Sequence, residues 1–111
     1  MSLHSFEGAS GEHYDYVALN LKNREAFPMG GGNYLFTRPS EKGEVIVCAG
    51  DSANLWTDFV MRWDIAKRKY GATVAYLRVN HDQKARRTER EDLVAKHHPA
   101  MNVDALGKAA S

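Results

Sequence analysis

The sequence lacks the features that mark secreted, disulfide-stabilised or membrane-spanning proteins. Cys48 is the only cysteine among 111 residues, so no internal disulfide can form, and its apolar neighbours predict a small buried side chain. The longest apolar run, residues 45–49, is far too short to span a bilayer, and the N-terminus has no basic and apolar leader. We therefore expect a cytoplasmic protein that does not contact membranes.

The chain also lacks a zinc motif and a large net charge. His97 and His98 have no paired cysteines, and adjacent side chains on a helix point about 100° apart, which makes a poor chelate. The formal net charge is only +1, but residues 62–96 contain ten Lys or Arg and five Asp or Glu. This asymmetry fits either a surface for phosphate backbones or solvated helix faces of mixed charge.

Two strand patterns joined by a turn predict a β-hairpin. Residues 34–37 and 44–49 are rich in aromatic and β-branched side chains, and residues 39–43 supply Pro, Ser and Gly for the turn. Three glycines at residues 30–32 precede the first strand. No Gly-Lys-Ser or Gly-Lys-Thr follows them, so we expect a flexible entry to the strand and no phosphate-binding loop.

A helical pattern follows the hairpin. Apolar residues recur at helical spacing from residue 53 to residue 70, with Asp51 or Ser52 as the predicted N-cap and Gly71 as the stop. The two tryptophans lie one heptad apart on this apolar face and are predicted to be core residues: Trp56 and Trp63.

A third strand and a second helix complete the pattern. Residues 73–79 are predicted to be a strand, and Asn80 or Asp82 can cap a helix that ends near His98, before Pro99. The order strand, strand, helix, strand, helix predicts an α+β fold. We expect a small three-stranded antiparallel sheet flanked by helices.

The length of the chain allows one domain, which we place at residues 27–102. Residues 1–26 are expected to be a partly irregular N-terminal extension, in which residues 14–21 fit either a strand or one helical turn. Residues 103–111 are small and mostly polar, which predicts a flexible C-terminal tail.

Three fragments in this order resemble the signature segments of the GIY-YIG nucleases. They are Gly32-Asn33-Tyr34-Leu35-Phe36, then the stretch from Val47 to Leu55, and finally the closing segment from Asp92 to Asn102. The resemblance covers about two thirds of the chain, residues 27–102. It implies four structural positions: Gly32, Gly50, Asn54 and Asn102.

The resemblance also implies a catalytic set. Members of this family use two tyrosines from the hairpin strands, an arginine from the first helix, and a glutamate from the last helix that binds one divalent metal. Such groups activate water, neutralise the phosphorane and hold the leaving oxygen of a phosphodiester. Here Tyr34 matches the first tyrosine, whereas Cys48 stands at the second. Asp58 stands at the arginine position and Arg90 at the glutamate position.

Both charged positions have thus exchanged sign, which predicts a degenerate site. Asp58 and Arg90 are expected to form a salt bridge, and because a guanidinium cannot ligate a metal, no cofactor is expected. We predict binding of nucleic acid, most simply DNA, without efficient cleavage. Arg86 and Arg87 are expected to face solvent. The basic residues expected to contact phosphates are Arg62, Lys67, Arg68, Arg86, Arg87 and Arg90.

Two alternatives remain open. In the first, Tyr34, Arg62 and Glu89 form a catalytic set, Glu89 binds a single Mg²⁺ or Mn²⁺, and the protein is an active, divergent endonuclease. In the second, the chain keeps only the scaffold and is a non-catalytic protein-interaction or structural domain. In each case Asn102 is expected to bond main-chain atoms near the cleft, because a short amide suits that task. The sequence leaves the oligomeric state open.

Overall fold

The described part of the chain is an α+β unit built on one antiparallel sheet. The computed structural model describes residues 3–22 and 27–102. Five strands lie in the order β1-β2-β5-β3-β4, and each neighbouring pair is antiparallel. The elements are β1 (Leu3–Glu7), β2 (His13–Ala18), β3 (Gly32–Ser40), β4 (Gly43–Ser52), α1 (Leu55–Tyr70), β5 (Val74–Val79) and α2 (Gln83–His97).

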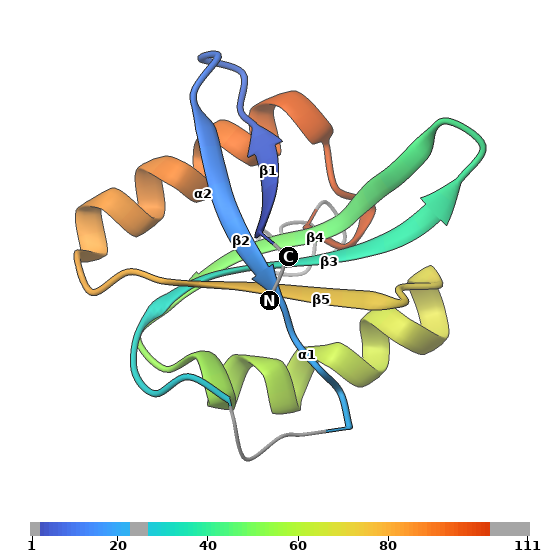
Figure 1. The fold of residues 1–111 in the computed structure, drawn as a ribbon, viewed down its shortest axis with the longest axis horizontal. Helices are drawn as coiled ribbons and strands as arrows, with labels where there is room; N and C mark the ends of the chain where they lie inside the picture. Colours follow the sequence, from blue (N-terminus) through green and yellow to red (C-terminus); the bar gives the residue numbers. More distant parts are fainter. Residues whose placement is uncertain (1–2, 23–26, 103–111) are drawn as a thin grey trace, which may run out of the picture.

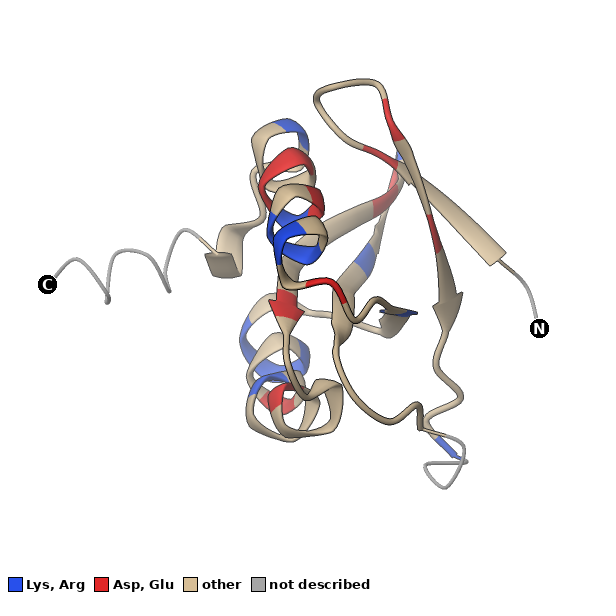
Figure 2. Ribbon diagram, turned by 90° about the vertical axis from the view of Figure 1, so that its left-hand side faces the viewer, with Lys and Arg blue, Asp and Glu red and all other residues tan. Residues whose placement is uncertain are grey.

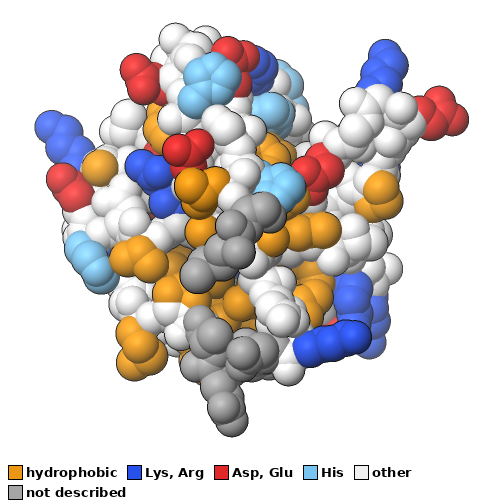
Figure 3. All heavy atoms as spheres, viewed as in Figure 1, with side chains coloured by type: hydrophobic (Ala, Val, Ile, Leu, Met, Phe, Trp, Pro, Cys, Tyr) orange, Lys and Arg blue, Asp and Glu red, His pale blue; other side chains and the backbone are white. Residues whose placement is uncertain are grey.

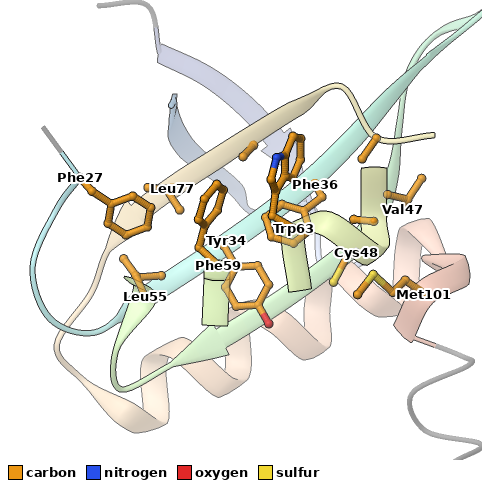
Figure 4. Close-up of a cluster of buried hydrophobic side chains, with 13 residues drawn as sticks. Phe27, Tyr34, Phe36, Val47, Cys48, Leu55, Phe59, Trp63, Leu77 and Met101 are labelled. Carbon is orange, nitrogen blue, oxygen red and sulfur yellow. The ribbon is translucent and has the colours of Figure 1, made fainter. Parts of the chain in front are cut away.

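Helices α1 and α2 cover opposite faces of the sheet (Figure 1). On one face, Phe59 and Trp63 of α1 pack with Phe36 of β3 in the larger apolar cluster (Figure 4). On the other face, Leu93 of α2 packs with Leu35. Removal of these side chains from water holds the three layers together. Within residues 3–22 and 27–102, no helix has the length and apolar character needed to cross a bilayer.

The hairpin of β3 and β4 positions much of the candidate site. Gly43 makes its turn with φ of 115°, a conformation that favours glycine. Tyr34 lies opposite Gly50 across the two strands. A Cβ atom on Gly50 would lie only 2.1 Å from Cζ of Tyr34, so the tyrosine ring can cross β4 only because this position has no side chain.

Capping fixes the ends of both helices. The Asn54 side chain accepts a hydrogen bond from the Thr57 backbone N–H at 3.2 Å, and Gly71 ends α1 with φ of 75°. Asp82 accepts hydrogen bonds from two backbone N–H groups at the start of α2. The predictions of Gly71 as a stop and of Asp82 as a cap are confirmed.

The α+β class and the element order from β3 to α2 are confirmed, but the sheet has five strands instead of three. Residues 3–18, expected to be partly irregular, supply β1 and β2. The alternation in β2 explains this, because Tyr14, Tyr16 and Ala18 face the apolar cluster of α2. Tyr16 is fully buried there.

Two local predictions about α1 are wrong. Asp51 and Ser52 belong to the end of β4, and Asn54 is the N-cap. Trp56 is 42% exposed because it lies on the flank of α1, where its ring meets Phe27 edge-on at 5.1 Å. Trp63 is a core residue, as predicted. The predicted tail, residues 103–111, lies outside the described residues.

Candidate functional site

A cleft of about 280 Å³ runs along the edge strand β4, between the two helices. Seen from the side in Figure 2, α2 lies above and α1 below the sheet edge, and both carry Lys and Arg. Five parts of the chain contribute its lining: Tyr34, Cys48, Ala49, Gly50, Asp51, Asp58, Arg62, Arg90, Met101 and Asn102. The cleft therefore brings together Tyr34, Cys48, Asp58 and Arg90, the four positions that the resemblance matches to the family's catalytic residues.

Asp58 is held from three sides on the α1 side of the strand. The Tyr34 hydroxyl donates a hydrogen bond to Oδ2 of Asp58 at 3.1 Å, and the Ser52 hydroxyl donates to Oδ1 at 2.9 Å. Nε of Arg62 lies 3.8 Å from the same Oδ2, a looser ion pair between side chains one helical turn apart. Asp58 is thus fixed as an acceptor, whereas Arg62 is only loosely held and its side chain is 43% exposed.

Burial keeps the Tyr34 hydroxyl and the Cys48 thiol protonated. It raises the pKa of Tyr34 far above its ordinary value and that of Cys48 to about 12, while the nearby charge of Arg62 opposes the rise in both groups. Figure 4 shows Cys48 beside Met101, at one end of the apolar cluster. Neither side chain can accept a proton as an anion near neutral pH.

Arg90 and Asp51 form the second ion pair of the cleft, on the α2 side of the strand. Nε of Arg90 lies 2.5 Å from Oδ1 of Asp51. This Nε atom is buried and has no hydrogen bond within the described residues, so the contact is electrostatic and its N–H does not point at the oxygen. A weaker approach of 4.0 Å joins Arg90 to Glu91.

Asn102 closes one end of the cleft by capping the sheet edge. Its Oδ1 accepts a hydrogen bond from the Ala49 backbone N–H at 2.8 Å, and its Nδ2 donates to the Ala49 carbonyl at 2.6 Å. The amide takes the place of the next strand, satisfying two backbone groups of β4 that point away from β3. These are the main-chain bonds expected of Asn102.

Glu89 lies outside this cleft. It is 3% exposed, accepts a hydrogen bond from the Tyr16 hydroxyl at 2.5 Å, and pairs with Nε of Arg78 at 3.1 Å. Burial raises the pKa of the Glu89 carboxyl, and the hydrogen bond from Tyr16 and the charge of Arg78 act in the opposite direction. The carboxyl borders a separate cavity of about 450 Å³ between α2, β2 and β5. The structure therefore does not bring together the predicted set of Tyr34, Arg62 and Glu89.

The predicted basic residues are divided among different surroundings. Arg62 and Arg90 line the cleft. Arg86, predicted to face solvent, is only 7% exposed and donates to the Asn80 carbonyl at 3.1 Å. The other three predicted phosphate contacts are exposed and do not line the cleft: Lys67, Arg68 and Arg87. On the face shown in Figure 3, the coloured Lys and Arg side chains are scattered among acidic and apolar ones.

The predicted salt bridge between Asp58 and Arg90 does not form. Both side chains reach the cleft, but Asp58 pairs with Arg62 and Arg90 pairs with Asp51. Asp51 and Ser52 are the site residues that sequence reasoning missed. Their position just before a helix favoured a capping role, and only the register of β3 against β4, which pairs Asp51 with Asn33 and Ser52 with Gly32, puts them next to the pair of Tyr34 and Gly50.

The residues of the cleft do not fit the divalent metal that the resemblance implies. Asp51 and Asp58 approach from opposite sides of β4, and each lies beside a guanidinium that repels a cation. Within residues 3–22 and 27–102, no group of three or more His, Cys, Asp or Glu could hold a metal ion.

No family model, curated protein or solved structure matches the chain.

Proposed function

We propose that the chain is a GIY-YIG nuclease-like domain whose altered site binds nucleic-acid phosphates, most simply those of DNA, without efficient cleavage. The observation that carries this proposal is the meeting of Arg62 and Arg90 in one cleft, from two helices on opposite faces of the sheet. Guanidinium groups bind phosphate oxygens through charge and paired hydrogen bonds. Two of them in one cleft can grip adjacent oxygens or adjacent phosphates of a backbone.

The arrangement of the core supports the family assignment. From β3 to α2 the order of elements is strand, strand, helix, strand, helix, and the glycine opposite Tyr34 is the one that the resemblance singled out. Tyr34, Asp58 and Arg90 also converge, although they lie far apart in the sequence. A degenerate member of the family would keep the scaffold that brings these positions together and change the residues that occupy them.

Loss of cleavage follows from the chemistry of the same positions. The cleft has Arg90 where a metal-binding carboxylate is expected, and the neighbouring Glu89 is turned toward Tyr16 and Arg78. Tyr34 and Cys48 are both protonated, so neither serves as a base. What remains is a site with two guanidinium groups, two carboxylates and a neutral hydroxyl.

Fluorescence anisotropy with a labelled DNA duplex and a labelled single strand tests this proposal. We expect binding that Arg62→Ala weakens by about tenfold, because it removes a charge-assisted contact. Arg68→Ala is the matched control, since Asp64 pairs with Arg68 at the same helical spacing as Asp58 with Arg62, but outside the cleft. Absence of binding, or equal losses in both variants, would contradict the proposal.

A plasmid-nicking assay with Mg²⁺ or Mn²⁺ tests the second half of the proposal. We expect no metal-dependent nicking by the wild-type protein. Nicking that disappears in Tyr34→Phe would instead establish an active endonuclease and would overturn the assignment of a degenerate site.

A further inference from the structure

Asp51 stands out among the four charged groups of the cleft because it is the least restrained carboxylate. Asp58 accepts hydrogen bonds from both Tyr34 and Ser52. Among the described residues, Asp51 makes no side-chain hydrogen bond and a single ion pair, with Arg90. Its side chain is 22% exposed, so water can solvate the carboxylate once it leaves the guanidinium.

The same ion pair leaves one hydrogen-bond donor of Arg90, its Nε–H group, without an acceptor in the part of the chain that the structure describes. Its Nε is buried and has no hydrogen bond within the described residues, although Oδ1 of Asp51 lies 2.5 Å away. A buried donor without an acceptor is costly, and a phosphate oxygen placed along its N–H would relieve that cost. The Asp51 carboxylate lies against the Arg90 guanidinium and offsets its charge, but it does not accept a hydrogen bond from Nε.

The charges of the cleft also bear on how it binds a phosphate. Arg62 and Arg90 supply two positive charges, and Asp51 and Asp58 supply two negative ones. An approaching phosphate therefore meets two carboxylates as well as two guanidinium groups. A negative side chain beside a cationic site lowers affinity for anions in general.

We infer that Asp51 is an internal competitor for Arg90, which a backbone phosphate must displace, and that this competition limits the affinity of the cleft for nucleic acid. The inference rests on the proposed function. Asp58 does not play this part, because Tyr34 and Ser52 hold it in place. The affinity-limiting residue is thus the one at the end of β4, where sequence reasoning expected a helix cap.

The test is anisotropy of a labelled DNA duplex with wild type, Asp51→Asn and Asp64→Asn, between about 50 and 200 mM KCl. Asp64→Asn changes the net charge equally and frees Arg68, outside the cleft. We expect Asp51→Asn to bind about tenfold more tightly with a nearly unchanged salt slope, because Arg90 holds a phosphate in both proteins and only the competing carboxylate is lost. Asp51→Ser, which also removes the charge, provides a second variant if the first is unstable.

The dependence on Arg90 decides between competition and a general charge effect. In an Arg90→Ala background, Asp51→Asn should give no gain in affinity. A gain that persists without Arg90, or that Asp64→Asn reproduces, would overturn the inference. If wild type binds and Arg62→Ala weakens binding while Asp51→Asn changes nothing, the inference fails and the proposed function stands. If neither wild type nor Asp51→Asn binds, both fail.

Discussion

Gly50→Ala should displace the tyrosine at the centre of the cleft. A Cβ atom at this position would lie 2.1 Å from Cζ, 2.3 Å from the hydroxyl oxygen and 2.5 Å from Cε1 of Tyr34. Carbon atoms attract one another only from about 3.5 Å outward, so the ring must move by more than about 1 Å. Tyr34 is buried and packs on Phe36 with ring centroids 5.2 Å apart, so it has little room to move.

The expected cost has two parts. Overpacking of a filled core costs about 1–3 kcal/mol, and loss of the hydrogen bond from Tyr34 to the Asp58 carboxylate adds roughly 1 kcal/mol or more. We therefore expect Gly50→Ala to lower the free energy of unfolding by about 2–4 kcal/mol. Urea denaturation followed by tryptophan fluorescence, to which the buried Trp63 contributes, measures it.

A double-mutant cycle assigns that cost to the ring. The clashing atoms are the distal atoms of the tyrosine ring, which valine lacks. In a Tyr34→Val background, Gly50→Ala should cost less than about 1 kcal/mol. An equal cost in the two backgrounds would refute the reasoning, because it would show that the backbone of β4 and not Tyr34 requires glycine.

Three further predictions concern other contacts of the fold. Asn102→Ala removes both hydrogen bonds to Ala49 and should cost about 1–3 kcal/mol in urea denaturation; an unchanged midpoint would show that water replaces the amide. Asn54→Ala removes the cap on Thr57 and should cost about 1 kcal/mol, whereas Asn54→Asp should cost little. Burial raises the pKa of Glu89 above its ordinary value of 4.5, so its stabilising contribution is complete below that pH and is lost as pH rises through the raised pKa. The stability of wild type should therefore fall relative to Glu89→Gln as the pH rises above 4.5, and a pH-independent difference would contradict this.

The central hairpin and the helices could be predicted because their determinants are local. The alternation of β3 and β4, the turn at Gly43, and the glycine after α1 are all visible in short windows of sequence. The N-terminal strands could not be predicted in the same way. The β2 segment is short enough to fit a helical turn, and it becomes a strand because Tyr16 packs with Leu93, 77 residues further along the chain.

The place of the candidate site in the fold could be predicted from the sequence, but the ion pairs within it could not. Tyr34, Asp58 and Arg90 meet as the resemblance implied, since the element order places them at one sheet edge. The ion pairs depend on which side of β4 each helix approaches, and Asp51 intervenes at that edge. Adjacent helix residues point about 100° apart, so Glu89 lies in the core while Arg90, the next residue of α2, lies in the cleft.

Arg86 is the clearest case of a residue whose surroundings no pattern disclosed. Arginine is rarely fully buried, so an arginine in a mixed-charge helix is predicted to face solvent. Its guanidinium instead meets the Asn80 carbonyl, and its own backbone carbonyl accepts a hydrogen bond from Asn33 at 2.9 Å. These contacts join α2 to β3 and to the loop before the helix, and they arise only once the sheet has formed.

The salt dependence of DNA binding tests the central claim most directly. Each phosphate contact to duplex DNA contributes about 0.9 to the slope of log K against log salt concentration. If Arg62 and Arg90 each hold a phosphate, the double variant Arg62→Ala/Arg90→Ala should bind more weakly and with a slope shallower by about 1.8. Lys67→Ala/Arg68→Ala removes the same charge outside the cleft and should leave the slope nearly unchanged. Equal slopes for wild type and the cleft variant, or equal losses in the two double variants, would contradict the account.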